Sequence, residues 1–272
     1  MGLVLRVNLT GERATMLATL YGRALDAGSP SPILGDTMAR EAVDAIDLDF
    51  TKTGLRRGDA AAVALRARHF DGWARDFLAA CPEATVLHLG CGLDTRVYRL
   101  DPGPGVRWLD VDYPDVIDLR RALYPPRDGY EMIGASVTDP GWLARVPGDR
   151  PVLVVAEGLV MYLTQDEGRG LFRRIVAHFP SGQFLFDGLS RRGIRLQRFN
   201  KAIQAAGARV HWGIDGCADL EAIDPRLRCV TIVSALELDG LDRLRMGYRV
   251  MVRIARVAPA ARRLAAFYRL EF

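Results

Sequence analysis

The chain has 272 residues, of which 49% are hydrophobic and 26% are charged, and its formal net charge is +4. This composition is that of a globular protein with a sizeable core, which excludes a disordered or fibrous chain. The small positive excess is a weak reason to expect an acidic substrate and a poor one to expect nucleic acid. No apolar run reaches the roughly 18 residues of a membrane span, so no membrane partner is expected.

Cysteine and histidine usage gives no sign of a metal site. The cysteines are Cys81, Cys91, Cys217 and Cys229, and neither they nor the histidines show metal-ligand spacing. A chain of this length does not need disulfides to stabilise its core, so no disulfide framework is expected. Residues 1–10 lack a signal-peptide cleavage pattern, and a reducing cytoplasm is the expected location.

The order of the predicted elements indicates an α/β fold. Residues 12–80 have helical periodicity, which breaks at Gly28–Pro32. Short apolar runs predict buried strands at Thr85–Leu89, Val106–Val111, Tyr130–Ala135, Val152–Ala156 and Phe184–Phe186. Helical segments alternate with them at Thr95–Leu100, Asp115–Leu123, Trp142–Leu143 and Thr164–Phe179. Such alternation predicts a parallel sheet with helices on both faces and right-handed crossovers.

Two local signals support the predicted helix starts. Pro114 stands where the second of these helices begins, a position that suits proline. Thr164 and Glu167 have the spacing of a capping box.

The last third of the chain is predicted to hold a helix and a hairpin. The helix spans Gly193–Ala206, and the β-like runs Arg228–Leu238 and Tyr248–Val257 are expected to pair and close one side of the sheet. The densest basic cluster is read as Arg191, Arg192, Arg195 and Arg198. It is either a solvated helix face or a clamp for an acidic substrate.

A glycine turn follows the first predicted strand, in the segment Leu89–Asp94. Gly90 and Gly92 let the backbone turn sharply and approach a ligand closely. A dinucleotide fingerprint would require a third glycine, but Thr95 stands there. Because S-adenosylmethionine has no phosphate to place at the helix N-terminus, the turn favours this cofactor over NAD. A plain tight turn is the alternative.

An acidic residue ends the second predicted strand. Asp112 lies 20 residues past Gly92, where a carboxylate can accept both hydroxyls of a ribose. The alternative is that Asp110 and Asp112 only cap the next helix, although Pro114 and Asp115 already serve that end.

A glutamate follows the fourth predicted strand. Glu157 comes directly after Val152–Ala156, at the sheet edge where ligands of open α/β folds bind. A buried carboxylate there would be stabilised beside a sulfonium or ammonium group. Since Gly158 follows at once, a surface loop glutamate is the alternative.

These segments together resemble the leucine carboxyl methyltransferase family, and within it the bacterial branch of tetracenomycin-type polyketide carboxyl methylases. The matching pieces are Val86–Arg96, Asp110–Pro114 and Ala156–Leu163, with further landmarks at Thr19–Ala24 and Leu65–Asp71. The resemblance implies a Rossmann-like class I methyltransferase fold, with a mainly parallel seven-stranded sheet, an antiparallel last strand and a helical N-terminal addition. It also implies S-adenosylmethionine as cofactor and S-adenosylhomocysteine as product.

The resemblance assigns roles to single residues around the reacting groups. Arg66 matches the arginine that binds the cofactor carboxylate, for which its planar fork is suited, and Arg68 is the alternative. Glu157 matches a glutamate that lines the cofactor pocket. Arg23 matches a basic residue near the reacting groups, and Tyr162 is expected to line the acceptor cavity or to be packed.

Further residues are assigned to the rest of the cofactor. Gly90 and Gly92 would hold the methionine moiety, and Asp112 the ribose. Ser136 and Val137 fall where relatives bind adenine, with Ser136 replacing an aspartate that is frequent there. The neighbouring members of the same site are Cys91, Asp94 and Tyr113.

The expected organisation is one domain over residues 1–272. Its portions are a helical cap (1–80), a cofactor-binding core (81–190) and an acceptor side (191–272).

The chemistry of methyl transfer favours a carboxylate as acceptor. A carboxylate is already ionised at neutral pH, whereas a phenol with a pKa near 10 would need a base. No base is evident beside the cofactor motifs, because His88 lies inside the first strand and is expected to be packed. The expected function is therefore O-methylation of an acidic, polyketide-like metabolite, helped by Arg23 or an arginine of 191–198.

Four other functions stay open at this point. They are a phenolic or hydroxyl O-methyltransferase, a methylase of a protein C-terminal carboxylate, a non-catalytic S-adenosylmethionine-binding scaffold and an NAD-dependent dehydrogenase. Thr95 speaks against the last, and the absence of a GxSxG motif excludes a nucleophile-elbow hydrolase.

Overall fold

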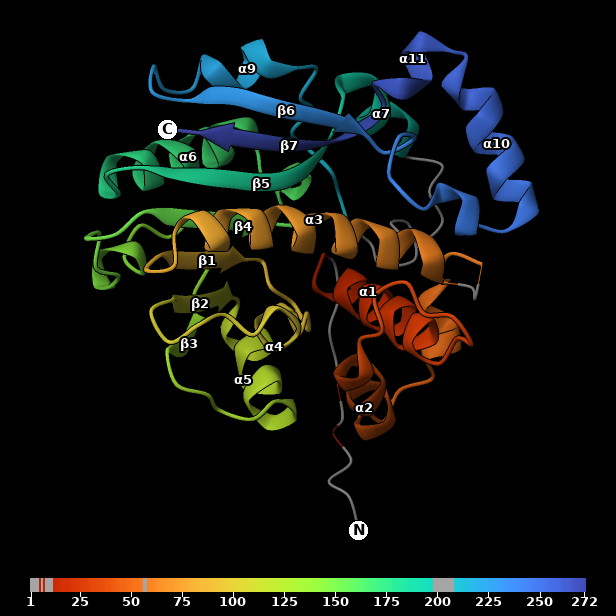
Figure 1. Cartoon of the computed structure of the whole chain (residues 1–272), viewed down its shortest axis with the longest axis horizontal. Helices are drawn as coiled ribbons and strands as arrows, with labels where there is room; N and C mark the ends of the chain where they lie inside the picture. The colour runs from red at the N-terminus through yellow and green to blue at the C-terminus, as the bar shows by residue number, and fades with distance from the viewer. Residues whose placement is uncertain (1–4, 6, 8–11, 56–57, 198–207) are drawn as a thin grey trace.

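A seven-stranded sheet forms the centre of the part of the chain that this computed structural model describes, which is residues 5, 7, 12–55, 58–197 and 208–272. The strand order is β3-β2-β1-β4-β5-β7-β6, and β7 runs antiparallel to both of its neighbours. This arrangement confirms the predicted class I fold (Figure 1). The strands are β1 Thr85–Leu89, β2 Arg107–Asp112, β3 Tyr130–Gly134, β4 Val152–Ala156, β5 Gly182–Leu189, β6 Arg228–Ser234 and β7 Ala265–Glu271.

The predicted strands of the parallel half are confirmed, with small differences at their ends. β1 and β4 have the predicted bounds and are buried at every position, as expected for strands covered on both faces. β5 is longer than the predicted Phe184–Phe186, because its end continues alongside β7 as far as Leu189.

The N-terminal third is helical, as predicted. Its elements are α1 Glu12–Ala27, α2 Thr37–Ala45, the 3-10 helix η1 Phe50–Thr53 and α3 Ala60–Ala80. The predicted break at residues 28–32 follows α1, and the buried carboxylate of Asp26 fixes the turn by accepting hydrogen bonds from the backbone of Ile33, Leu34 and Gly35.

Helices cover the two faces of the sheet. α3 lies across one face (Figure 1) and packs Phe70, Ala74 and Phe77 on it, whereas α6 packs Phe172 and Ile175 on the other. The remaining helices are α4 Arg96–Leu100, α5 Pro114–Leu123, η2 Leu143–Arg145, η3 Val160–Tyr162, α6 Gln165–His178, α7 Arg191–Gln197, α9 Cys217–Glu221, η4 Leu241–Arg243, α10 Met246–Arg256 and α11 Pro259–Arg262.

Both predicted helix-start signals are confirmed. Pro114 is the first residue of α5, and Thr164 and Glu167 form a reciprocal capping box at α6. The predicted helix Gly193–Ala206 is helical up to residue 197, and its remainder lies outside the described residues.

The predicted C-terminal hairpin is wrong. Residues 248–256 belong to helix α10, Val257 is its C-cap, and the antiparallel partner of β6 is β7. Valine and isoleucine are typical of strands, which explains the error. However, Met246, Val250 and Ile254 follow one another at four-residue spacing, the period of one helix face.

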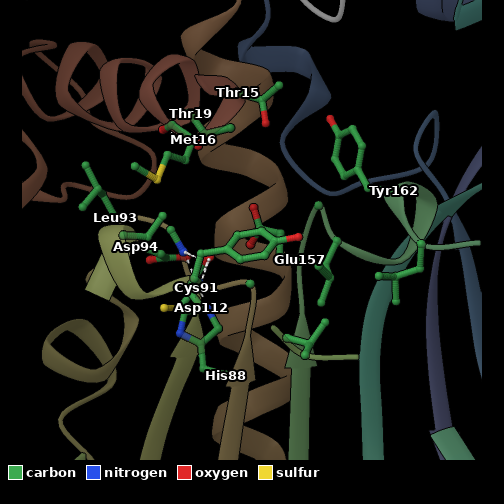
Figure 2. A pocket seen from close by; sticks show the side chains of 18 of the residues that line it. Thr15, Met16, Thr19, His88, Cys91, Leu93, Asp94, Asp112, Glu157 and Tyr162 are labelled. Carbon is green, nitrogen blue, oxygen red and sulfur yellow. Dashed lines mark hydrogen bonds and ion pairs between the residues drawn. The ribbon is translucent and has the colours of Figure 1, made fainter. Parts of the chain in front are cut away.

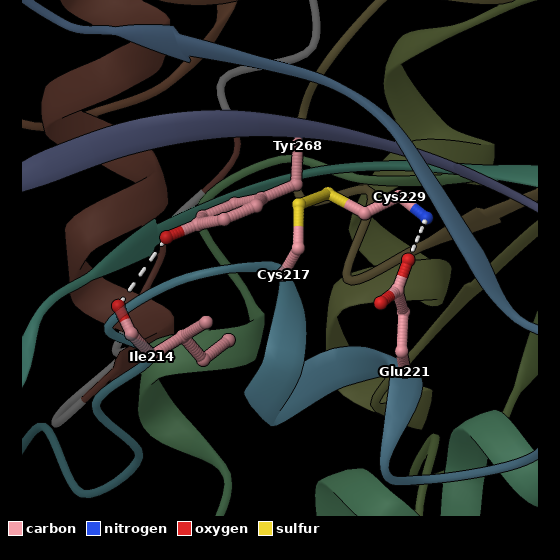
Figure 3. Close-up of a disulfide and its surroundings, with 5 residues drawn as sticks. All are labelled: Ile214, Cys217, Glu221, Cys229 and Tyr268. Atoms are coloured by element: carbon pink, nitrogen blue, oxygen red, sulfur yellow. Dashed lines mark hydrogen bonds between the residues drawn. A yellow bond between two sulfur atoms is a disulfide. The ribbon is translucent and has the colours of Figure 1, made fainter.

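The expectation that the cysteines stay unbridged is also wrong for one pair. Cys217 of α9 and Cys229 of β6 form a disulfide, with Cα atoms 5.5 Å apart. Figure 3 shows how the bridge lies beside Tyr268, whose hydroxyl donates to the carbonyl of Ile214 at 3.3 Å. The bridge fastens the segment after residue 208 to the sheet rather than compensating for a small core.

No helix in the described ranges is long and apolar enough to cross a membrane.

Candidate functional site

Two adjoining cavities open at the carboxyl edge of the sheet. The loop cavity, of about 280 Å³, is lined by the glycine turn after β1 together with Asp112, Ser136 and Glu157. The apolar cavity, of about 590 Å³, lies between α1, η1, α3, the end of β5 and the start of β7. The residues that line both are Thr15, Thr19, Arg66, Met161 and Tyr162.

The glycine turn forms the floor of the loop cavity. Gly90 and Gly92 have φ angles of +58° and +49°, in the left-handed region that strains other residues. A side chain at Gly90 would come within 2.9 Å of Leu159, and one at Gly92 within 3.0 Å of Met16. Both glycines are therefore required by backbone conformation and by close packing.

Asp112 ties the end of β2 to the glycine turn. Its two carboxylate oxygens accept the backbone N–H groups of Gly92 and Tyr113, each at 2.7 Å (Figure 2). Burial raises the pKa of Asp112 above its ordinary value. In the first turn of α5, Asp115 and not Asp112 accepts the backbone N–H of Val116, at 3.0 Å. The contact of Asp112 with Gly92 therefore gives it a role beyond capping the helix.

The side chain of Asp110 is fully buried and forms a polar cluster. It accepts from His88 at 3.0 Å and from the Trp108 indole at 2.9 Å, and it is ion-paired with Arg120. Arg120 is fully buried and donates to the carbonyls of the glycine turn at residues 92 and 94, each at 2.8 Å. His88 is thus packed, as predicted.

Sequence reasoning missed Arg120 as a support of the glycine turn. A signal was present, because Val116, Ile117 and Arg120 lie on the buried face of α5 at helical spacing. An arginine in that row suggests a buried charge with a partner.

Glu157 is the centre of an ion network and not a surface loop residue. Its side chain is 6% exposed and pairs with Arg66 at 2.8 Å and with the fully buried Arg96. Burial opposes ionisation of Glu157, but Arg66 and Arg96 outweigh it and lower its pKa. Arg96 also pairs with Asp71 at 2.7 Å, which links α3, α4 and the end of β4.

Arg66 stands where the two cavities meet. Its side chain is 25% exposed, and it pairs with Glu157 and, at 3.3 Å, with Asp187 at the end of β5. Arg68, the alternative to Arg66, lines a separate cleft with Asp36 and donates to a backbone carbonyl at residue 239. The geometry thus brings Arg66, and not Arg68, to the two cavities.

Asp187 is a second site residue that sequence reasoning missed. It lines the apolar cavity, accepts the backbone N–H of Gly158 and has a pKa raised by burial. The signal was available: Asp187 follows the predicted strand Phe184–Phe186 directly, just as Glu157 follows Val152–Ala156.

Arg23 braces the glycine turn from α1. It is buried, lines the loop cavity, donates to the carbonyl of Leu93 at 3.0 Å and pairs with Asp36 at 3.3 Å. Asp94, predicted at the cofactor site, lines the same cavity but is ion-paired with Arg99 at 2.8 Å. Both side chains therefore hold the loop in shape.

Ser136, Val137 and Tyr113 also line the loop cavity. The Ser136 hydroxyl lies 2.8 Å from that of Thr138. Cys91 is buried in the cavity wall, where burial raises its pKa well above the ordinary value.

Helix α1 closes the site from above. Figure 2 shows Thr15, Met16 and Thr19 facing the strand ends that carry Asp112 and Glu157, with Tyr162 at the side. The sequence predicted helices in this part of the chain, but not that Thr15 and Met16 would line the site.

The apolar cavity contains few charged groups among the described residues that line it: Asp49, Lys52, Arg66 and Asp187. The basic cluster at 191–198 does not supply them, since Arg191 pairs with Asp215 and Asp219 on the surface. Arg192 and Arg195 are exposed, and Arg198 lies outside the described residues.

Known proteins resemble the chain along most of its length. A model of the leucine carboxyl methyltransferase family matches residues 16–126. The chain is 48% identical over 222 residues to the tetracenomycin polyketide synthesis O-methyltransferase TcmP of Streptomyces glaucescens, with 82% of each chain covered. It is 39% identical over 244 residues to the S-adenosyl-L-methionine-dependent methyltransferase dpfgK of Gibberella zeae, again with 82% of each covered.

A solved structure shares the fold at low identity. A crystal structure of a proposed methyltransferase from Thermobifida fusca matches with a TM-score of 0.57 and 18% identity, over 92% of this chain and 93% of the other.

Proposed function

Because the chain belongs to the leucine carboxyl methyltransferase family and is an S-adenosylmethionine-dependent O-methyltransferase, we propose that it methylates a carboxylate on an apolar, polyketide-like acid. The observation that carries this proposal is the place of Arg66. It is a half-buried cation at the junction of the cavity that would hold the methyl donor and the apolar cavity.

The loop cavity fits S-adenosylmethionine in its donor and acceptor groups. Each oxygen of Asp112 accepts one backbone N–H and keeps a lone pair, so the pair can take a ribose diol. A side chain at Gly90 or Gly92 would collide with Leu159 or Met16. Glycine at both positions lets the backbone of the turn come close to the ligand. Arg66 offers a fork for the methionine carboxylate, and Glu157 offers the opposite charge for the ammonium group.

The other cofactor contacts are proposed from the wall of the same cavity. Ser136 and Val137, with Tyr113, would contact the adenine. Arg23 and Asp94 would act indirectly, because their own partners already hold them to the loop. We also propose that residues 1–80 form a helical cap, residues 81–190 the cofactor-binding core and residues 191–272 the acceptor side.

When bound, S-adenosylmethionine supplies a methyl group already activated by the sulfonium charge. The chain then has to align the acceptor oxygen and exclude water. Arg66, with Lys52, which also lines the apolar cavity, would hold an acceptor carboxylate. Tyr162 lines both cavities and would orient the acceptor.

The apolar cavity supports a bulky, apolar acceptor. Its walls include Leu65, Leu189, Leu238, Leu241 and Phe267. Its volume of about 590 Å³ suits a polycyclic molecule, since ligand cavities commonly span roughly 300–1,000 Å³. The relative from Streptomyces glaucescens is named for tetracenomycin polyketide synthesis, which supports an acceptor of that chemical class.

A phenolic acceptor is the second candidate, and Asp187 favours it. This carboxylate lines the apolar cavity and has a raised pKa, so it can take a proton from a hydroxyl group. Its ion pair with Arg66 assigns it a positioning role if the acceptor is a carboxylate.

A methyl-transfer assay tests the proposal. The purified protein is given labelled S-adenosylmethionine and matched polycyclic aromatic acids and phenols, and the product is treated with mild base. We expect label in a base-labile methyl ester. A base-stable ether would instead support the phenolic function, and cofactor binding without transfer to any acceptor would support the scaffold role.

We also propose a cytoplasmic location, because the methyl donor is a cytoplasmic metabolite. Since disulfides of cytoplasmic proteins are usually transient, the bridge between Cys217 and Cys229 provides the check. Alkylation of thiols at the moment of lysis should trap a fraction of the two cysteines in the reduced state.

A further inference from the structure

The positive charge of the protein is concentrated in one C-terminal segment. Residues 241–263, which comprise η4, α10 and α11, contain seven arginines and one aspartate. Their formal charge of +6 exceeds the +4 of the whole chain, so the remainder is net negative. The arginines are Arg243, Arg245, Arg249, Arg253, Arg256, Arg262 and Arg263.

The same segment exposes an apolar helix face. Of the ten large hydrophobic residues that are exposed in the described part of the chain, six lie between positions 246 and 257. Met246, Val250, Ile254 and Val257 are 75%, 51%, 66% and 81% exposed. Their spacing places them in one row along the helix. We call this row the apolar stripe of α10.

The apolar stripe lies on the periphery of the molecule and beside the acceptor side of the site. Figure 1 shows α10 and α11 at the outer edge, next to the start of α3. Val252 is buried against the body of the protein, and the Arg256 side chain donates to the carbonyl of Leu236 at 2.6 Å. Leu241 of η4 and Leu238 just before it line the apolar cavity.

The charge decides among the classes of partner. Nucleic acid would use the arginines but not a row of exposed aliphatic residues. A symmetric contact between two copies would place +6 against +6. A helix with arginines beside an aliphatic row has the character of a segment that lies in the interface of an anionic bilayer.

We propose that α10, with η4 and α11, binds the surface of an anionic lipid bilayer. The apolar stripe enters the headgroup region, and the flanking arginines contact lipid phosphates. Because a single short helix buries little area, the binding is reversible. The sequence analysis expected no membrane partner because no apolar run is long enough to span a bilayer. That criterion does not test for a helix that lies on the bilayer surface.

Vesicle co-sedimentation of the full chain tests the proposal. We expect binding to vesicles of phosphatidylglycerol and phosphatidylcholine, little binding to phosphatidylcholine alone, and release at about 0.5 M salt. The double variant Arg249→Gln, Arg253→Gln should lower the partition coefficient by about 30-fold. Met246→Ser with Ile254→Ser should lower it by at least about tenfold.

A charge-matched control distinguishes the effect of the α10 arginines from that of net charge. Arg121 and Arg145 are exposed elsewhere, and changing both to Gln should alter the partition coefficient by less than about threefold. The S-adenosylmethionine affinity of all variants should stay unchanged, which shows that they fold. This readout is independent of the acceptor proposed above.

Three outcomes would overturn the proposal. One is the absence of binding to anionic vesicles at low salt, which would leave the stripe to a protein partner. Another is equal loss of binding in the control variant. The third is a concentration-dependent dimer in sedimentation velocity that Met246→Ser with Ile254→Ser abolishes, which would assign the stripe to a second copy.

Discussion

The loop cavity and the apolar cavity share a wall but are held in place by different forces. Around the loop cavity, buried ions fix the backbone: Arg96 joins Asp71 and Glu157, and Arg120 holds the glycine turn. Around the apolar cavity, aliphatic and aromatic side chains do most of the packing. All members of such an enzyme class use the same cofactor, so fixed polar contacts can bind it. An apolar wall instead selects the acceptor by shape and leaves its individual contacts less constrained.

The largest effect is expected where the ion network is broken. Arg96→Met removes a fully buried cation and leaves Glu157 and Asp71 without it. The free energy of unfolding should fall by about 3–5 kcal/mol, since removing one partner from a buried ion network leaves excess buried negative charge. Denaturant titration measures this. Arg121→Met, at an exposed arginine, should change it by less than about 0.5 kcal/mol, and a similar loss in both variants would refute the special role of the network.

The next largest effect is expected at Arg66, the residue between the two cavities. Arg66→Ala should weaken S-adenosylmethionine binding by about 2–4 kcal/mol, because it removes a buried charge partner. Calorimetry measures the loss, with Arg68→Ala as the matched control from the same helix. A loss below about 0.5 kcal/mol for Arg66→Ala would transfer the role to Arg68.

Removal of the ribose carboxylate should have a slightly smaller effect. Asp112→Ala should raise the dissociation constant of S-adenosylmethionine by about 100-fold, as expected for hydrogen bonds to a charged group. Asp118, exposed on α5, provides the control when changed to Ala. Unchanged affinity in Asp112→Ala would contradict the ribose assignment.

The smallest effect is expected in the apolar wall. Leu241→Ala removes side-chain contact with the acceptor and should lower kcat/KM for an apolar acceptor by about tenfold. The affinity for S-adenosylmethionine should not change. Parallel losses in both measurements would show that the two cavities are not independent.

The cofactor half of the fold was predictable because parallel strands end at one edge. Asp112 is the last residue of one strand and Glu157 directly follows another, and parallel pairing brings these ends together. The same rule applies to Asp187, which directly follows the predicted strand Phe184–Phe186. The sequence therefore contained the signal for this residue. The roles of Gly90 and Gly92 could be predicted because sharp turns with positive φ angles favour glycine.

The C-terminal part was less predictable for two physical reasons. The apolar residues of α10 face outward, so their periodicity does not report burial, and their β-branched character suggests a strand. The pairing of Cys217 with Cys229 depends on α9 packing alongside β6, which is a tertiary contact that spacing does not reveal.

The bridge between those two cysteines also changes what unfolding means for this protein. It closes a loop across a sequence separation of 12, and a ring of that size removes chain entropy worth about 3 kcal/mol from the denatured ensemble. Oxidised and reduced samples therefore unfold to different end states, one cyclic and one linear. Melting temperatures of two preparations can be compared only at one fixed thiol–disulfide potential.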